Sequence, residues 1–111
     1  MHKQTETLVA AFLDVNLVLK KTAVISKGDI TSTQLNLSRL VSIAVNCGAV
    51  NIIIGHNHPS GLAVPSRGDV EAVSETAKTL EKLGVKLCDS IIVAGDEYFS
   101  MAQSKKFKYL F

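Results

Sequence analysis

The sequence predicts an α/β protein in which a mixed β-sheet is flanked by two helices, in the element order β-β-α-β-α-β-β. Three observations predict this class. Strand-like apolar segments lie towards both ends of the chain, two internal segments repeat their apolar residues at the helical period, and three consecutive isoleucines stand between them. The chain has 111 residues, enough for one hydrophobic core, so we expect residues 1–111 to form a single domain.

The N-terminal part of the chain predicts a β-hairpin. Residues Glu6–Val15 have a strand-like composition, and Asp14 and Asn16 mark a turn. Leu17–Ser26 is expected to return as the second strand, and the segment 27–29 then breaks the pattern.

The middle of the chain predicts a helix followed by a central strand. Apolar residues recur at helical spacing in Leu35–Cys47, and Gly48 is placed to end that helix. Val50–Ile54 is a short aliphatic run, which favours a central strand covered on both faces. A polar loop, Gly55–Pro65, follows.

The last third predicts a second helix and two strands. The helix begins at Ser66 and ends at Gly84, and a strand is expected at Val85–Val93 and another at Glu97–Met101. The apolar residues of the helix fall on one stripe, Val70, Val73, Ala77 and Leu80.

Hydropathy and charge exclude several classes of protein. The longest apolar run, Leu8–Leu13, has six residues, and a membrane span needs about 18. Since the sequence also lacks the pattern of a secretory signal, we expect a cytoplasmic protein without a membrane partner. The formal net charge of +2 argues against nucleic-acid binding that is driven by charge alone.

Two further features are expected to be structural. The basic cluster Lys105, Lys106 and Lys108 could touch phosphates, but a solvated tail explains it better. Cys47 and Cys88 lack the spacing of metal ligands, and buried thiols are a better interpretation than a disulfide.

Two histidines and an aspartate form the pattern most typical of a metal site. His56 and His58 follow the aliphatic strand, and residues two apart in an extended segment project to the same side. Asp69 comes eleven residues after His58, in the first turn of the second helix. Two nitrogens and one oxygen would leave a fourth position open for water, as hydrolytic metal sites do.

Each of these residues also has a simpler explanation. A lone His-x-His in a loop is usually no metal site. Ser66 and Asp69 together make a good helix start, with Ser66 as the N-cap. Glu6, on an early strand, would normally face solvent.

The complete pattern nevertheless resembles a known signature. The run His56-Asn57-His58-Pro59-Ser60-Gly61, followed by Pro65-Ser66 and Asp69, resembles the JAMM (JAB/MPN+) metalloprotease motif, and in particular its bacterial RadC-like branch. The similarity extends over nearly the whole chain. The segment that contains Glu6 resembles the first strand of the family, and residues 87–93 resemble its late strand.

The resemblance implies a fold, a cofactor and a set of roles. The fold would be the MPN (JAB) fold, and His56, His58 and Asp69 match the zinc ligands of the family. Glu6 matches the carboxylate that holds the water and takes its proton, and Ser66 matches the serine that orients the water and stabilises the oxyanion. The implied activity is a zinc-dependent metallohydrolase in which a metal-activated water attacks the amide carbonyl of a peptide or isopeptide substrate.

The sequence also departs from the family. Ser38 stands where the family usually has proline, and Ser90 stands where it usually has histidine. Full-length RadC proteins carry an N-terminal helix-hairpin-helix-like region that this sequence lacks, so we expect either one domain of a longer protein or a short relative.

Several alternatives remain open at this point. One is a DNA-repair or DNA-associated accessory domain, and another is a metal-bearing scaffold without turnover. Two histidines and a carboxylate also suit iron or manganese. The oligomeric state is open as well: the edge strands and the segment 107–111 could pair in a homodimer, or that segment could simply be mobile.

Overall fold

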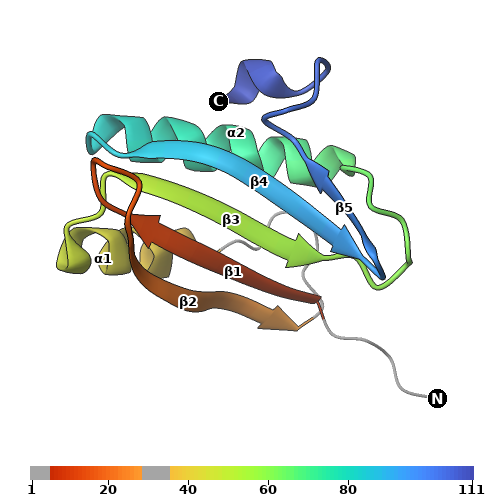
Figure 1. Ribbon diagram of the computed structural model, residues 1–111, viewed down its shortest axis with the longest axis horizontal. Helices are drawn as coiled ribbons and strands as arrows, with labels where there is room; N and C mark the ends of the chain where they lie inside the picture. The colour runs from red at the N-terminus through yellow and green to blue at the C-terminus, as the bar shows by residue number, and fades with distance from the viewer. Residues whose placement is uncertain (1–5, 29–35) are drawn as a thin grey trace.

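The computed structural model describes residues 6–28 and 36–111, which form a mixed five-stranded sheet and two α-helices (Figure 1). The predicted α/β class and element order are confirmed. The strand order is β2-β1-β3-β4-β5, with β3 and β4 parallel and the other pairs antiparallel. The elements are β1 (Glu6–Leu13), β2 (Leu19–Gly28), α1 (Leu37–Cys47), β3 (Asn51–Asn57), α2 (Arg67–Lys82), β4 (Lys86–Ala94), β5 (Glu97–Ser100) and the 3₁₀ helix η1 (Lys108–Leu110).

The predicted hairpin is confirmed, with different strand ends. β1 ends at Leu13 because the Asp14 side chain accepts hydrogen bonds from the backbone N–H groups of Asn16 and Val18, at 2.8 and 3.0 Å. Leu17 has a φ of +64° in this turn, a conformation that is uncommon for residues other than glycine. Because of this turn, the second strand starts at residue 19 and not at residue 17. At its other end it continues through Gly28 rather than stopping at residue 26.

Both helices lie behind the sheet in the view of Figure 1, against its buried face. β1 directs Leu8, Ala10 and Phe12 into this core, and β3 directs Ile52 and Ile54 into it. The expectation that the central strand is covered on both faces is therefore wrong. Ile53, which points to the opposite face, is only half-buried because no described helix packs there.

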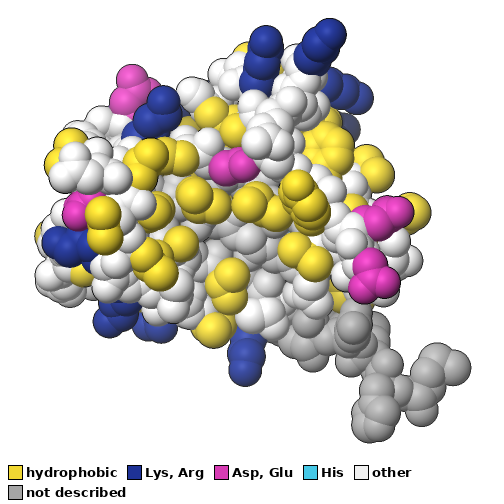
Figure 2. Space-filling view, viewed as in Figure 1, with side chains coloured by type: hydrophobic (Ala, Val, Ile, Leu, Met, Phe, Trp, Pro, Cys, Tyr) yellow, Lys and Arg dark blue, Asp and Glu magenta, His cyan; other side chains and the backbone are white. Residues whose placement is uncertain are grey.

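The open face of the sheet carries apolar side chains, which Figure 2 shows as a band across the molecule. Val9, Val24 and Val93 on this face are each 42–43% exposed. The alternation of buried and less buried residues along β1 follows directly from packing on one side.

The helix ends follow the predicted signals. The Asn36 side chain caps α1 by accepting from the backbone N–H of Arg39, and Gly48 follows the helix with a φ of +67°. The predicted start of this helix at Leu35 lies outside the described residues. Gly84 likewise has a positive φ of +73° just beyond α2.

β3 is longer than predicted at its C-terminal end. Gly55, where a loop was expected, pairs with Val9 of β1 and with Ile91 of β4, and the strand continues to Asn57. Since β3 has a hydrogen-bonded neighbour on each side, the ladder extends through His56. The first histidine of the motif is therefore on a central strand and not in a loop.

The structural expectations for the cysteines and lysines have separate outcomes. Cys47 and Cys88 are free, as expected, but they are half-buried rather than buried. Cys88 is the extra residue at a bulge in the β3–β4 pairing, and Cys47, which ends α1, packs against the edge of the core. Lys105, Lys106 and Lys108 are exposed. In the described part of the chain, no helix is long and apolar enough to cross a membrane.

Candidate metal centre

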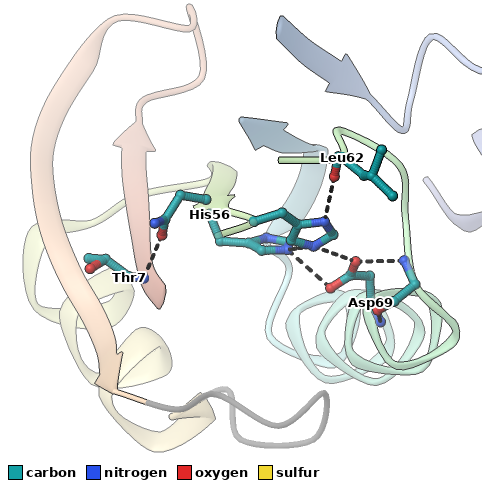
Figure 3. Close-up of polar contacts among 7 residues, drawn as sticks. Thr7, His56, Leu62 and Asp69 are labelled. Carbon is teal, nitrogen blue, oxygen red and sulfur yellow. Dashed lines mark hydrogen bonds and ion pairs between the residues drawn. The ribbon is translucent and has the colours of Figure 1, made fainter. Parts of the chain in front are cut away.

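The three predicted ligands converge where the end of β3 meets the start of α2 (Figure 3). The Nε2 atoms of His56 and His58 are 3.0 Å apart. His56 Nε2 lies 3.0 Å from Asp69 Oδ1, and His58 Nε2 lies 3.0 Å from Asp69 Oδ2. Among the described residues, this is the one group of three such side chains whose donor atoms all lie within 4.8 Å of one another. The convergence predicted from the sequence is confirmed.

The spacing of these donor atoms fits a metal ion. For metal–ligand bonds of 2.0–2.1 Å, two ligands of a tetrahedral ion are about 3.3 Å apart, close to the 3.0 Å separations of the triad. Two imidazole lone pairs at 3.0 Å would repel each other unless a proton or a cation lay between them. The group could therefore hold a metal ion.

Hydrogen bonding around the histidines orients their lone pairs. The Nδ1 atom of His58 lies 3.0 Å from the backbone oxygen of Leu62. Because a carbonyl oxygen only accepts, this Nδ1 carries the proton and leaves Nε2 free to bind a metal. The Nδ1 atom of His56 is buried and has no hydrogen-bond partner among the described residues.

Asp69 has two roles in the structure. Its backbone N–H donates to Ser66 Oγ at 3.1 Å, and the Ser66 N–H donates to Asp69 Oδ2 at 2.7 Å, which makes a reciprocal capping box. The capping interpretation of these two residues is thus confirmed, and it coexists with the ligand position, because the same carboxylate faces both histidines.

The electrostatic environment favours the ionised form of Asp69. Burial alone would raise the pKa of its carboxyl, but the hydrogen bonds from His56 and from the Ser66 backbone, together with the charge of His56, lower that pKa from 3.8 to about 2. The carboxylate is therefore ionised at every pH at which the histidines could bind a metal.

We expect the metal-free chain to lose stability as the pH falls from about 4 to about 2. In this range the unfolded Asp69 binds a proton that the folded one does not, so protons favour unfolding, by on the order of 2 kcal/mol in total. The measurement is urea unfolding on both sides of this range. Asp69→Asn, whose amide does not titrate there, should show a smaller pH dependence, and an equal dependence would contradict the expectation.

Glu6 and Ser66 line the same cavity as the triad. Glu6 is the first residue of β1, and Leu8, two residues later, pairs with His56. Glu6 is half-buried rather than solvent-facing. Neither residue belongs to the ligand group, and their roles as base and as oxyanion donor stay predictions.

The sequence analysis did not single out Asn57, which ties the first strand to the site. Its Oδ1 atom accepts a hydrogen bond of 2.7 Å from the backbone N–H of Thr7, next to Glu6 (Figure 3). Asn57 stands between the two histidines, so alternation along β3 directs it away from them. The position of Asn57 inside the His-x-His motif was the available signal of a role. Its hydrogen-bond partner could not be predicted, because that partner lies 50 residues away in sequence.

Asn57→Ala should lower the free energy of unfolding by about 1 kcal/mol while leaving metal content unchanged. The Thr7 N–H would lose its acceptor, which is costly in a half-buried position, and the start of β1 with Glu6 would be less fixed. Denaturant unfolding and metal analysis test this. Asn46→Ala, at an exposed position of α1, is the control, and equal stability of the two variants would contradict the anchoring role.

Comparison with known proteins identifies relatives over nearly the whole chain. A UPF0758 protein of Streptococcus suis is 35% identical over 102 residues, covering 92% of this chain and 42% of that protein. A UPF0758 protein of Carboxydothermus hydrogenoformans is 33% identical over 106 residues, covering 96% and 47%. One of Cupriavidus taiwanensis is 35% identical over 101 residues, covering 91% and 44%. The chain spans less than half the length of these relatives.

The RadC-like JAB domain family matches residues 1–106. This confirms the resemblance inferred from the histidine motif and from the serine and aspartate that follow it. The mixed sheet with two helices is compatible with the JAB/MPN fold. The chain therefore belongs to the RadC-like JAB domain family.

Proposed function

We propose that this chain is a zinc-dependent hydrolase that cleaves an amide bond of a peptide or isopeptide substrate. The observation that carries the proposal is the convergence of His56, His58 and Asp69 beside a cavity that Glu6 and Ser66 also line. Such an arrangement would place a metal, a base and a hydrogen-bond donor around one space, which is what metal-assisted hydrolysis requires.

The chain would hold zinc through the two Nε2 atoms and the Asp69 carboxylate. When bound, zinc polarises a carbonyl and lowers the pKa of a coordinated water to about 7. Glu6 is proposed to accept the proton of the attacking water and to return it to the leaving amine. Ser66 Oγ already accepts from the Asp69 N–H, and its hydroxyl hydrogen can still be donated to the developing oxyanion.

We expect the protein to bind one zinc ion and to melt at a higher temperature with it. An ion present at 100 times its Kd stabilises the folded state by about 2.7 kcal/mol, which corresponds to a rise in Tm on the order of 10 °C for a domain of this size. Metal analysis of protein purified without added metal, together with melting curves in zinc, iron(II) and manganese(II), tests the choice of metal. If one equivalent of iron(II) or manganese(II) raised the Tm more than one equivalent of zinc, the choice of zinc would be contradicted.

Turnover is tested separately from metal binding. Proteome-derived peptides incubated with the zinc-loaded protein should yield new termini, detected by mass spectrometry. Zinc binding without any cleavage would contradict the hydrolase function and favour the metal-bearing scaffold. The same samples titrated with DNA at low salt test the DNA-associated alternative, for which the exposed Lys105, Lys106 and Lys108 are the only observation in the described residues.

A further inference from the structure

The cavity beside the triad has a volume of about 470 Å³, within the usual range of ligand pockets. Away from the metal ligands its wall is mostly apolar. Leu8 of β1, Ile54 of β3 and Val73 of α2 line it and are at most 7% exposed. The core of the protein thus forms one side of the cavity, and that side is rigid because it belongs to two central strands and a helix.

The outer side of the cavity has exposed apolar residues. Leu62 and Val64, in the segment between β3 and α2, line it and are 66% and 58% exposed. The Leu62 carbonyl accepts from His58 Nδ1, which fixes this rim relative to the triad. Large apolar side chains left exposed beside an apolar cavity are typical of a surface that a ligand covers.

The charged groups of the cavity argue against an acidic ligand side chain. Glu6 and Asp69 are the carboxylates among the described lining residues, and that lining includes no lysine or arginine. Once the amide that is cleaved, or the hydroxamate that replaces it, occupies the zinc ion, an acidic side chain beside it would meet two carboxylates and no cationic side chain. An uncharged side chain would meet Leu62, Val64 and the buried apolar wall instead.

Ser90 closes the buried side of the cavity. It is 1% exposed, it pairs in register with Ile54, and its Oγ atom has no hydrogen-bond partner among the described residues. A residue as small as serine leaves depth that a larger side chain would fill. This position therefore limits how far a ligand can reach into the protein.

We propose that the cavity is a specificity pocket for a large uncharged apolar side chain, such as that of leucine, methionine or phenylalanine, next to the amide that is cleaved. The inference rests on the proposed hydrolase function and names the substrate class of the same site. Ser90 sets the depth of the pocket, and Leu62 and Val64 form its rim.

The test uses chelating probes, so that it does not depend on turnover. The N-acetyl hydroxamates of leucine, glycine and aspartate are titrated calorimetrically into the zinc-loaded chain. Burial of the leucine side chain should make its hydroxamate bind at least about 10-fold more tightly than that of glycine. The aspartate hydroxamate should bind no more tightly than that of glycine.

Substitutions locate the preference. Val64→Asp should bring the leucine-to-glycine affinity ratio close to one, and Ser90→Leu should lower it by filling the pocket. The matched control is Val18→Asp, because Val18 is also 58% exposed but lies in the β1–β2 turn, outside the cavity lining. If Ser90→Leu does not fold, the affinity ratios of Val64→Asp and Val18→Asp can still be compared, and that comparison decides whether the cavity sets the preference.

Opposite results separate two failures. If wild type binds zinc but binds the three hydroxamates equally, or binds none, the specificity pocket is wrong. The pocket is also wrong if Val64→Asp and Val18→Asp change the ratio equally. If the protein does not bind zinc at all, the proposed function fails first, and the pocket fails with it.

Discussion

Replacing Asp69 by alanine should lower the affinity for zinc at least about 100-fold, because loss of an outer partner of a ligand already costs 10–100-fold. The substitution removes one of three donors and the only negative charge among them. It also removes the acceptor for the Ser66 N–H, which should destabilise the start of α2 by about 1 kcal/mol. Zinc competition with a chromophoric chelator measures the first effect, and urea unfolding of the metal-free protein measures the second.

Two controls separate the ligand role of Asp69 from its capping role. Asp69→Asn retains an oxygen that can accept from the Ser66 N–H, so it should recover stability without recovering zinc affinity. Asp96→Ala removes an exposed carboxylate from the turn between β4 and β5 and should change neither property. Equal zinc content in wild type and in Asp69→Ala would exclude this residue from the ligand set.

Glu6→Gln should reduce turnover by about 10²- to 10⁴-fold with unchanged zinc content, since this is the usual contribution of a general base. Glutamine keeps the size and hydrogen-bonding reach of the side chain but cannot accept a proton at neutral pH. Glu6 lines the cavity, so the substitution acts inside the site. Initial rates on the peptides that wild type cleaves, with metal analysis of the same samples, provide the measurement.

Glu97→Gln is the matched control for this experiment. Glu97 is exposed on β5 and does not line the cavity, so its substitution should leave turnover at the wild-type value. Unchanged turnover in Glu6→Gln would show that another group accepts the proton. A simultaneous loss of zinc and turnover would instead show that Glu6 supports the metal site itself.

Local signals in the sequence predicted the helix ends and the convergence of the two histidines well. Gly48 ends α1 through its own left-handed backbone conformation, and Ser66 begins α2 through a hydrogen bond to a residue three positions away. Both signals are local, so the sequence alone shows them. The spacing of His56 and His58 predicted their convergence for a similar reason, since alternation along an extended chain is a local property.

Long-range contacts explain what the sequence did not predict. The length of β3 depends on pairing with β1 and β4, and the aliphatic run alone could not show that only one face would be covered. Asn57 has the same limitation, because its partner Thr7 is brought close only by the sheet. The assignment of Glu6 came from the family resemblance, since a glutamate 50 residues before a motif has no local signal of its own.

The double use of one carboxylate has a consequence for the dynamics of the protein. The oxygen of Asp69 that faces His58 is also the one that accepts from the Ser66 backbone. Fraying of the first helical turn would therefore displace a ligand, and loss of the ion would loosen that turn. With a metal held by the triad, opening of the segment between β3 and α2, exchange of that metal and melting of the helix end would be linked as one local unfolding event.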